Sequence, residues 1–374
     1  MNSLATPNNL YIAHTITDIA QDQLDEWSRV IAEGPPLPPV RWHLRRDAYL
    51  RHAAIGASIR IEGNSLSNAQ TDALLEGERV DAPPTQRLEA RNYDNALGLA
   101  SRFAQDPAFE WSEMVFRVVN GAVMRDLEGD SQGRYRDGPV AVGTAYQAPD
   151  HRAVPGLMQS LVEWLPTAEV HPLVRTALLH LNLVAIHPWL NGNGRSARIL
   201  SQLELMRTVG APELISIEPA LEEQQDAYFA RIRDAVGPNY APDRHSATEW
   251  IEWYVGLHTA RLDEGQRLNH ATMHDIVSVL GALERRGDPS DWGPLIHLAA
   301  FGPFVTRQVM HAYGNSPSAA RALIARLVAA GWIEPHGQTR GRHYLGTERV
   351  AALQLRGPEL LRRSGAPTLG LDVA

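Results

Sequence analysis

A segment of twelve residues, HPWLNGNGRSAR, combines the side chains needed for chemistry on a phosphate. Its glycines would let backbone N–H groups approach an anion, and a helix beginning after them would add its dipole. Arg195 and Arg198 are three residues apart and share one face of such a helix. His187, at the start of the segment, can titrate near neutrality and could serve as a general base. The segment therefore predicts a phosphate-binding turn beside a base.

The neighbouring sequence decides between this interpretation and an ordinary surface loop. His-Pro and Asn-Gly pairs alone usually mark turns. Here the runs TALLHLNLVAI and ILSQLELM enclose the segment, and both are typical of buried helices. A polar turn inside the core needs partners or a function, so we favour a functional site.

The segment resembles the signature of the Fic family, HxFx(D/E)GNGRxxR. The matching positions are His187, Gly192, Asn193, Gly194, Arg195 and Arg198. Trp189 stands where the family usually has phenylalanine, and Asn191 where it usually has an acidic residue. The resemblance implies transfer of AMP from ATP to a Ser, Thr or Tyr hydroxyl of a target protein.

The resemblance also implies a role for each residue of the turn. His187 would remove the proton of the hydroxyl, Asn193 would contact the α-phosphate, and Arg195 and Arg198 would take the β- and γ-phosphates with their planar forks. The implied nucleotide site comprises Asn191, Gly192, Asn193, Gly194, Arg195, Ser196, Arg198 and Tyr228. From the residues alone, an aromatic side chain such as Tyr228 on a helix is more often part of a core.

Asn191 leaves the use of metal open. The family's acidic residue holds Mg²⁺, and a neutral amide offers one oxygen without charge, so Asn191 would be a weak ligand. Mg²⁺ or Mn²⁺ would then bind mainly through the nucleotide phosphates, with slower AMP transfer. Transfer of another phosphate-linked group, or a mainly regulatory protein, are the alternatives, and we favour AMP transfer because the other signature positions match.

Upstream, SIRIEGN resembles the family's inhibitory motif, (S/T)xxxE(G/N). The residues concerned are Ser58, Glu62, Gly63 and Asn64. Without the resemblance, they would indicate an amphipathic helix that ends at Gly63, with Ser58 and Glu62 as a polar pair one turn apart. With it, Glu62 would pair with Arg198 and block the γ-phosphate position, because a carboxylate competes with phosphate for an Arg fork.

Between the two motifs, residues 133–165 resemble the family's flap hairpin followed by a helix. Val140, Val142 and Tyr146 are expected to form a short exposed strand that pairs with an extended segment of the target protein. The residues alone are equally compatible with an ordinary β-hairpin.

Composition limits the class of protein. The chain has 374 residues, 44% of them hydrophobic, which predicts a globular protein of two or three domains. It has no cysteine, hence no disulfide or thiolate metal site, and no segment typical of a signal peptide or membrane span, so we expect a cytoplasmic protein without a membrane partner. All 35 basic residues are arginine, which excludes P-loop ATPases, protein kinases and Schiff-base enzymes, all of which need a lysine.

The chain is predicted to be mainly α: a Fic-fold helical bundle with a small β-hairpin flap, followed by a winged helix-turn-helix domain. Helices are expected at 18–33, 43–62, 67–76, 87–105, 111–127 and from 248 to about 261. The expected domains are an N-terminal helical region with the inhibitory helix (1–110), a Fic core (111–245), a helical linker (246–285) and a winged helix-turn-helix domain (286–374).

The C-terminal part has its own pattern. Helices are expected at 304–312 and 318–330, and two wing strands at 332–334 and 343–345. The second helix would enter the major groove of DNA, with phosphate contacts from Arg321, Arg326, Arg340 and Arg342. From His270 onward, 11 Arg face 8 acidic residues, a modest excess, so dimerisation or target contact is an equal alternative.

Two functions follow. The first is an autoinhibited protein adenylyltransferase that uses ATP, and the resemblance implies that two copies could pair. The alternative is a DNA-binding transcriptional regulator or toxin–antitoxin-like module, whose Fic domain senses nucleotide or has a variant phosphotransfer activity.

Overall fold

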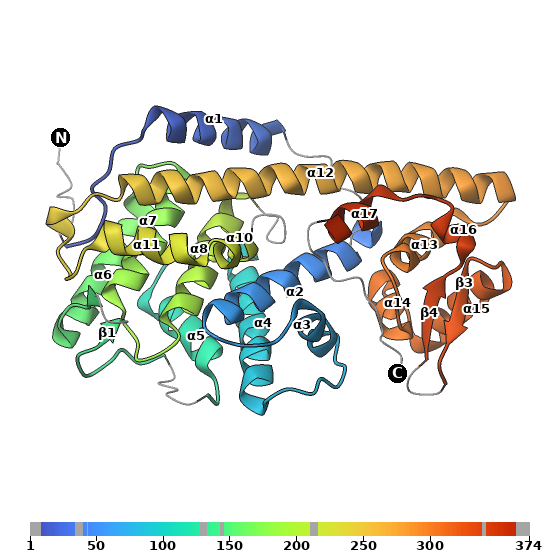
Figure 1. Ribbon diagram of the computed structural model, residues 1–374, viewed down its shortest axis with the longest axis horizontal. Coiled ribbons are helices and arrows are strands. Elements are labelled where there is room, and N and C mark those ends of the chain that lie inside the picture. The colour runs from blue at the N-terminus through green and yellow to red at the C-terminus, as the bar shows by residue number, and fades with distance from the viewer. Residues whose placement is uncertain are drawn as a thin grey trace. The chain divides into compact units, whose positions relative to one another are not determined.

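The computed structural model describes residues 9–33, 40–42, 44–127, 133–142, 146–209, 216–338 and 342–363. The chain divides into two compact units, each with its own hydrophobic core. Unit 1 comprises Met1–Glu33 and Arg51–Leu262, and unit 2 comprises Gly34–Leu50 and Asp263–Ala374. Helices dominate the described part of both units, which confirms the mainly α prediction (Figure 1).

Unit 1 contains the segments that carry both motifs. Its helices are α1 (Asp18–Glu33), α3 (Asn68–Leu75), α4 (Pro84–Gln105), α5 (Glu113–Met124), α6 (Val154–Trp164), α7 (Pro172–Ile186), α8 (Asn193–Val209), α10 (Glu218–Glu223) and α11 (Gln225–Val236). Two more helices, α2 (Leu44–Ile61) and α12 (Thr248–Arg286), begin in one unit and end in the other. Short 3₁₀ turns lie at His151–Ala153, Leu165–Thr167 and Pro242–Arg244.

The centre of unit 1 is formed by α4, α5, α7 and α8, which pack against one another (Figure 1). Most residues of α7 are buried, which explains why its sequence is apolar on nearly every face. Pro172 opens this helix at a position where a missing N–H costs nothing, and the His171 imidazole caps it by accepting from the N–H of Leu173. The turn between α7 and α8 therefore begins and ends on rigid, buried elements.

The expected hairpin is present as β1 (Ala141–Val142) and β2 (Tyr146–Gln147). The two strands are antiparallel, with Val142 opposite Tyr146 and Ala141 opposite Gln147. The prediction of one exposed strand carrying Val140, Val142 and Tyr146 is wrong in this respect, because Tyr146 lies on the second strand and is 7% exposed.

The observed helices differ from the prediction mainly at their ends. The first lies where it was expected, and α4 begins at Pro84 because proline suits the first helical turn. The largest difference is α12, which continues past residue 261 to Arg286 before Gly287, with φ 71°, ends it. The sequence directly after Arg261 is polar, so it gave little sign that the helix continues. It contains no proline that would stop the helix.

The compact units also differ from the four predicted domains. The N-terminal helical region and the Fic core share one hydrophobic core, since α4 packs directly on α5 and α8. The expected helical linker at 246–285 nearly coincides with α12, and the division between units falls inside that helix, after Leu262.

Unit 2 has the element order expected for its C-terminal part. A 3₁₀ turn at Val40–Trp42 and another at Ser290–Trp292 accompany α13 (Gly293–Ala300), α14 (Thr306–Tyr313), α15 (Pro317–Ala329), β3 (Ile333–His336), β4 (His343–Gly346), α16 (Glu348–Ala351) and α17 (Arg356–Arg363). The strands are antiparallel, and Phe304, expected within the first helix, instead pairs through its main chain with Tyr344. The winged-helix assignment itself stays a prediction.

Candidate active site

His187 stands at the end of α7 in a left-handed conformation, with φ 52° and ψ 58°. Its ring nitrogen Nδ1 lies 3.3 Å from the Val184 carbonyl oxygen. A carbonyl can only accept, so Nδ1 carries the proton and the lone pair of the neutral ring is on Nε2. Burial lowers the pKa of His187 to about 4, although the Val184 hydrogen bond and the Glu62 carboxylate act in the opposite direction. The imidazole is therefore a neutral base at physiological pH.

The turn after His187 is held by its own side chains. Gly192 has φ 77°, and a Cβ there would lie 2.7 Å from Met124 Sδ, so only glycine fits. The amide of Asn193 accepts from the N–H of Trp189 at 3.0 Å and donates to the carbonyl of Trp189 at 2.9 Å. Trp189 is fully buried, as expected for an aromatic anchor.

Two predicted phosphate contacts are wrong because the side chains are engaged elsewhere. Asn193 is 3% exposed, with both amide atoms on Trp189, so its side chain shapes the turn instead of meeting an α-phosphate. Ser196 is fully buried, and its hydroxyl accepts from Asn120 Nδ2 at 3.1 Å. Asn120 also donates to the main-chain oxygen of Asn191, so it supports the turn from α5.

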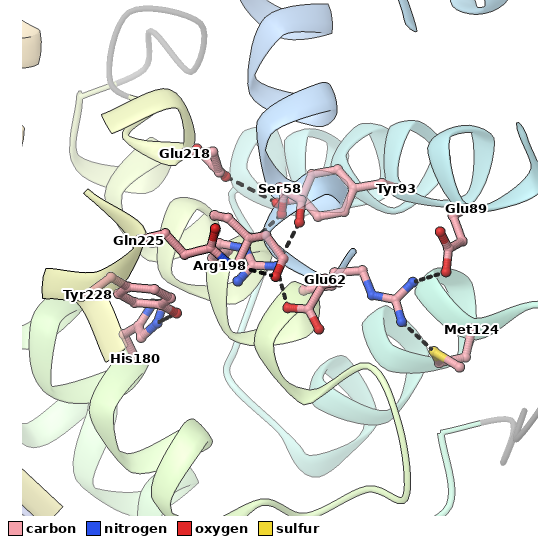
Figure 2. A network of polar contacts seen from close by, with 12 residues as sticks. Ser58, Glu62, Glu89, Tyr93, Met124, His180, Arg198, Glu218, Gln225 and Tyr228 are labelled. Carbon is pink, nitrogen blue, oxygen red and sulfur yellow. Dashed lines mark hydrogen bonds and ion pairs between the residues drawn. The ribbon is translucent and has the colours of Figure 1, made fainter. Parts of the chain in front are cut away.

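Arg198 reaches the end of α2, where the predicted inhibitory residues lie (Figure 2). Its Nε donates to Ser58 Oγ at 2.7 Å, and its Nη2 donates to the Ser58 carbonyl at 3.0 Å and to Glu62 Oε1 at 2.8 Å. The expected Glu62–Arg198 ion pair is therefore present. Burial alone would raise the pKa of Glu62, but the charges of Arg198 and Arg195 outweigh it and keep that pKa below its usual value.

The Glu62 carboxylate lies at the first turn of α8. A Cβ on Gly194 would be only 2.5 Å from Glu62 Oε1, so the glycine is what allows the carboxylate to come so close. The N–H groups of a first helical turn have no acceptor within the helix and attract anions. The Glu62 carboxylate therefore lies beside a helix start that favours an anion.

Arg195 has a looser environment. Its Nη1 is 3.4 Å from Glu89 Oε1 on α4 and its Nη2 is 3.6 Å from Met124 Sδ, while its buried Nε has no partner among the described residues. Asn64 donates to the other oxygen of Glu89 at 2.7 Å, which links the end of the inhibitory motif to the same carboxylate. Glu89 escaped the sequence analysis because an acidic residue on a helix usually marks only a solvated face.

The C-terminal end of α2 is also held from α10 and α11. Arg60 donates to both oxygens of Glu222, at 2.5 and 2.7 Å, and Gln225 Nε2 donates to the Ile61 carbonyl at 3.2 Å. Gly63, with φ 92°, then ends the helical turn as expected. These contacts fix the end of α2 from which Glu62 projects.

Tyr228, expected at the nucleotide, is a core residue. It is 1% exposed, and its hydroxyl lies 2.8 Å from His180 Nε2 (Figure 2). Its ring packs against Phe229, Trp250 and Trp253. The ring is thus part of the core, while Arg198 of the candidate site also acts on the hydroxyl, and the contact with a nucleotide stays a prediction.

The side chains of the turn do not form a metal site by themselves. Asn191 is exposed and offers one amide oxygen, while the nearby carboxylates of Glu62 and Glu89 are engaged with arginines. Among the described residues, the one His/Asp/Glu cluster with metal-ligand spacing is His52, Asp72 and Glu76, on α2 and at α3. The residues at the turn therefore do not fit a metal held by protein ligands.

In unit 2, the arginines expected at DNA differ in their surroundings. Arg321, Arg326 and Arg342 are exposed, and the guanidinium of Arg326 also lies over the Trp292 ring at 5.3 Å. Arg340 lies outside the described residues. DNA binding stays a prediction.

None of the helices in the described part of the chain has an apolar stretch of the length that a bilayer requires.

Comparison with known proteins agrees with this geometry. Residues 112–205 match the Fic/DOC family. The chain is 28% identical over 191 residues to protein adenylyltransferase Fic of Drosophila willistoni, covering 50% of this chain and 36% of that protein. It is 28% identical over 207 residues to protein adenylyltransferase fic-1 of Caenorhabditis elegans, covering 53% and 40%. The chain thus spans well under half the length of these curated relatives.

Solved structures show the same fold. A Fic family protein from Desulfovibrio desulfuricans superposes with a TM-score of 0.59 at 24% identity, covering 90% of this chain and 98% of that one. A fragment of Fic-1 from C. elegans superposes with a TM-score of 0.56 at 24% identity, covering 68% and 73%. Residues 112–205 of this chain therefore match the Fic/DOC family, within a fold that the chain shares with these solved Fic proteins.

Proposed function

We propose that this protein is an autoinhibited protein adenylyltransferase, which moves AMP from ATP to a hydroxyl side chain of a target protein. The observation that carries the proposal is the Glu62 carboxylate at the first turn of α8, paired with Arg198 Nη2 and close to His187. A carboxylate in that place stands in for a phosphate oxygen, so it marks where a nucleotide would bind. The names of the relatives, protein adenylyltransferase, support the same chemistry.

The proposed reaction uses His187 as the general base. Its Nε2 takes the proton of the target hydroxyl as that oxygen forms a bond to the α-phosphorus of ATP. The bond between the α-phosphorus and the bridging oxygen breaks, and pyrophosphate leaves with the electron pair. His187 then returns its proton to solvent or to pyrophosphate. The free enzyme already holds the base neutral, so no prior deprotonation is needed.

The two arginines have different tasks in this proposal. Arg195 has a buried Nε without a partner among the described residues and long contacts to Glu89, at 3.4 Å, and Met124, at 3.6 Å, so its fork is free to turn to the phosphates. Arg198 must first lose Glu62, because the two share a short ion pair. Positioning and charge neutralisation by such groups supply most of the rate in phosphate-transfer reactions.

The hairpin would present the target. Its strands are short, and we propose that β1, rather than the buried Tyr146 side chain, offers main-chain groups to an extended target segment. A metal ion would enter with the nucleotide, held by its phosphates and by water, since the turn supplies no available carboxylate.

Intact-mass measurement of the Glu62→Gly protein after incubation with ATP and Mg²⁺ or Mn²⁺ tests this function. A gain equal to AMP supports it. A gain equal to phosphate would indicate a different transfer, and no gain with either metal would contradict AMP transfer.

The pH dependence of that labelling tests the state of the base. The pKa of His187 lies at about 4, below its ordinary value, so the neutral form persists until the pH falls through that range. We expect the labelling rate of Glu62→Gly to change by less than about twofold between pH 6 and pH 8 and to fall below about pH 5. A half-maximal rate near pH 6.5 would show that His187 titrates as a solvated histidine.

A carboxylate at position 191 should improve metal use. Asn191→Asp in the Glu62→Gly background is expected to raise labelling about threefold to tenfold at limiting Mg²⁺, because Mg²⁺ prefers a charged oxygen ligand beside the phosphates. The measurement is the labelling rate as a function of Mg²⁺ concentration, with Asn191→Ala as the control for loss of the amide. An unchanged Mg²⁺ requirement in Asn191→Asp would show that position 191 does not contact the metal.

A further inference from the structure

Arg136 lies in the segment before the hairpin and is 6% exposed. Its Nε donates to the His187 carbonyl at 2.9 Å, and its own main-chain N–H donates to the Pro188 carbonyl at 2.9 Å. Its two terminal nitrogens donate to the carbonyls of Gly138 at 2.9 Å and Pro149 at 2.5 Å, one on each side of the hairpin. One guanidinium thus joins the catalytic turn to both ends of the β1–β2 hairpin.

Arg136 and its neighbours supply hydrogen-bond donors to the carbonyls at the end of α7. The last carbonyls of a helix lack partners within the helix. Here the Val184 carbonyl accepts from His187 Nδ1, the Ala185 carbonyl accepts from the Tyr146 hydroxyl at 2.7 Å, and the Ile186 carbonyl lies 3.5 Å from Arg136 Nη2. A cation at this end also complements the helix dipole.

His187 itself needs external support. Its φ of 52° is in the left-handed region, which residues other than glycine rarely adopt, and such conformations persist only where the surroundings enforce them. Arg136 contacts the carbonyl of His187 at 2.9 Å and that of Ile186 at 3.5 Å, which belong to the two peptide groups on either side of the His187 Cα, so it restrains both groups that set this conformation.

Within the described residues, no carboxylate hydrogen-bonds the buried Arg136 guanidinium, whose acceptors there are main-chain carbonyls. Burial lowers the pKa of Arg136, because it outweighs the charge of Asp150, which favours the protonated form. The lowered pKa reflects the cost of keeping the charge of Arg136 out of water. The free-energy cost of burying this guanidinium therefore has to be offset by the structure that its hydrogen bonds stabilise.

We infer that Arg136 is a positioning residue that holds His187 in its left-handed conformation and fixes it to the hairpin. The inference rests on the proposed function, because the task it assigns is to keep the base aimed at the hydroxyl of a target held by the hairpin. Displacing a catalytic group by about 1 Å can lower a rate about a hundredfold, so the restraint matters for the reaction more than for the fold.

The test uses the full chain in the Glu62→Gly background. Arg136→Gln is expected to lower the self-labelling rate at saturating ATP by about tenfold to a hundredfold, while the Kd for ATP changes by less than about twofold. Arg136→Lys, which keeps the charge but loses the fork, is expected to recover part of the rate. Arg152→Gln is the matched control, since exposed Arg152 bonds the side chain of Asp150 and no atom of the turn among the described residues.

An Arg136→Gln rate within about twofold of its parent would overturn the inference. If Arg136→Gln fails to fold, Arg136→Lys replaces it, because lysine keeps the charge but cannot donate to the His187, Gly138 and Pro149 carbonyls at once. A drop of at least about threefold in Arg136→Lys, with the Kd for ATP unchanged, would support the restraint, and an unchanged rate would overturn it.

A second readout separates this inference from the proposed function. The rate at which diethyl pyrocarbonate modifies His187, followed by peptide mass, reports the accessibility of its ring without any transfer reaction. We expect Arg136→Gln to raise this rate at least about threefold over its parent, because the half-buried imidazole becomes mobile. If Glu62→Gly never labels, the proposed function fails, and an equal modification rate in both proteins would independently overturn the positioning role.

Discussion

Replacing Glu62 with glycine is expected to raise self-labelling with ATP labelled on its α-phosphate by about tenfold to a hundredfold. The Glu62 carboxylate is 2.8 Å from Arg198 Nη2 and lies against Gly194 at the start of α8. A hydrogen bond between charged groups contributes about 1.5–3 kcal/mol. Its removal should raise the apparent affinity of this position for a phosphate group by a corresponding factor. The measurement is the initial rate of label incorporation at fixed ATP.

Two variants control for this effect. Glu78→Gly makes the same chemical change at an exposed position outside a helix and is expected to leave labelling at the level of the unmodified protein. Glu62→Gln keeps the size of the side chain but removes its charge, so it is expected to release labelling only in part. Absence of labelling in Glu62→Gly with both Mg²⁺ and Mn²⁺ would contradict the proposal of autoinhibited AMP transfer.

Replacing His187 with alanine in the Glu62→Gly background is expected to lower labelling by about a hundredfold to ten-thousandfold, the contribution typical of a general base. The ring is neutral, with its proton on Nδ1 toward Val184, so alanine removes the proton acceptor. The phosphate-binding residues remain in place, so the Kd for ATP should change little. Rates from intact mass and Kd from calorimetry together distinguish loss of the base from loss of binding.

His151→Ala is the matched control for this substitution. His151 follows the hairpin and its Nδ1 is 3.6 Å from Asp150, away from the turn residues. It should label like its Glu62→Gly parent. A His187→Ala protein that labels within about threefold of that parent would show that another group removes the proton.

The fold followed from local patterns to a large extent. The continuous apolar sequence of α7 and the signals at helix ends placed most helices of unit 1 within a few residues. The end of α12 was missed because a polar helix gives little periodic signal, and its last residue, Arg286, lies 25 residues after the expected end at about Arg261. The division into units also escaped prediction, since a boundary inside a continuous helix leaves no break in the sequence.

For the site, the sequence identified the right segments but not the task of every side chain. Asn193 and Ser196 match the expected segment, yet their side chains hold the turn through Trp189 and Asn120. Tyr146 was expected to face a target, and instead its hydroxyl caps the last turn of α7. A motif specifies which residue types recur at a spacing, and it does not specify which of their atoms are already bonded.

By itself, the sequence determined the chemistry of the turn: a base, glycines that admit an anion, and two guanidinium groups on one helical face. These features are local, because a turn and the first helical turn after it are fixed by residues within about four positions of one another. Only the tertiary structure decided that Glu89 contacts Arg195 and that Arg136 donates a hydrogen bond to the His187 carbonyl. Those partners come from segments 106 and 51 residues away, where packing sets the distances and sequence spacing carries no information about them.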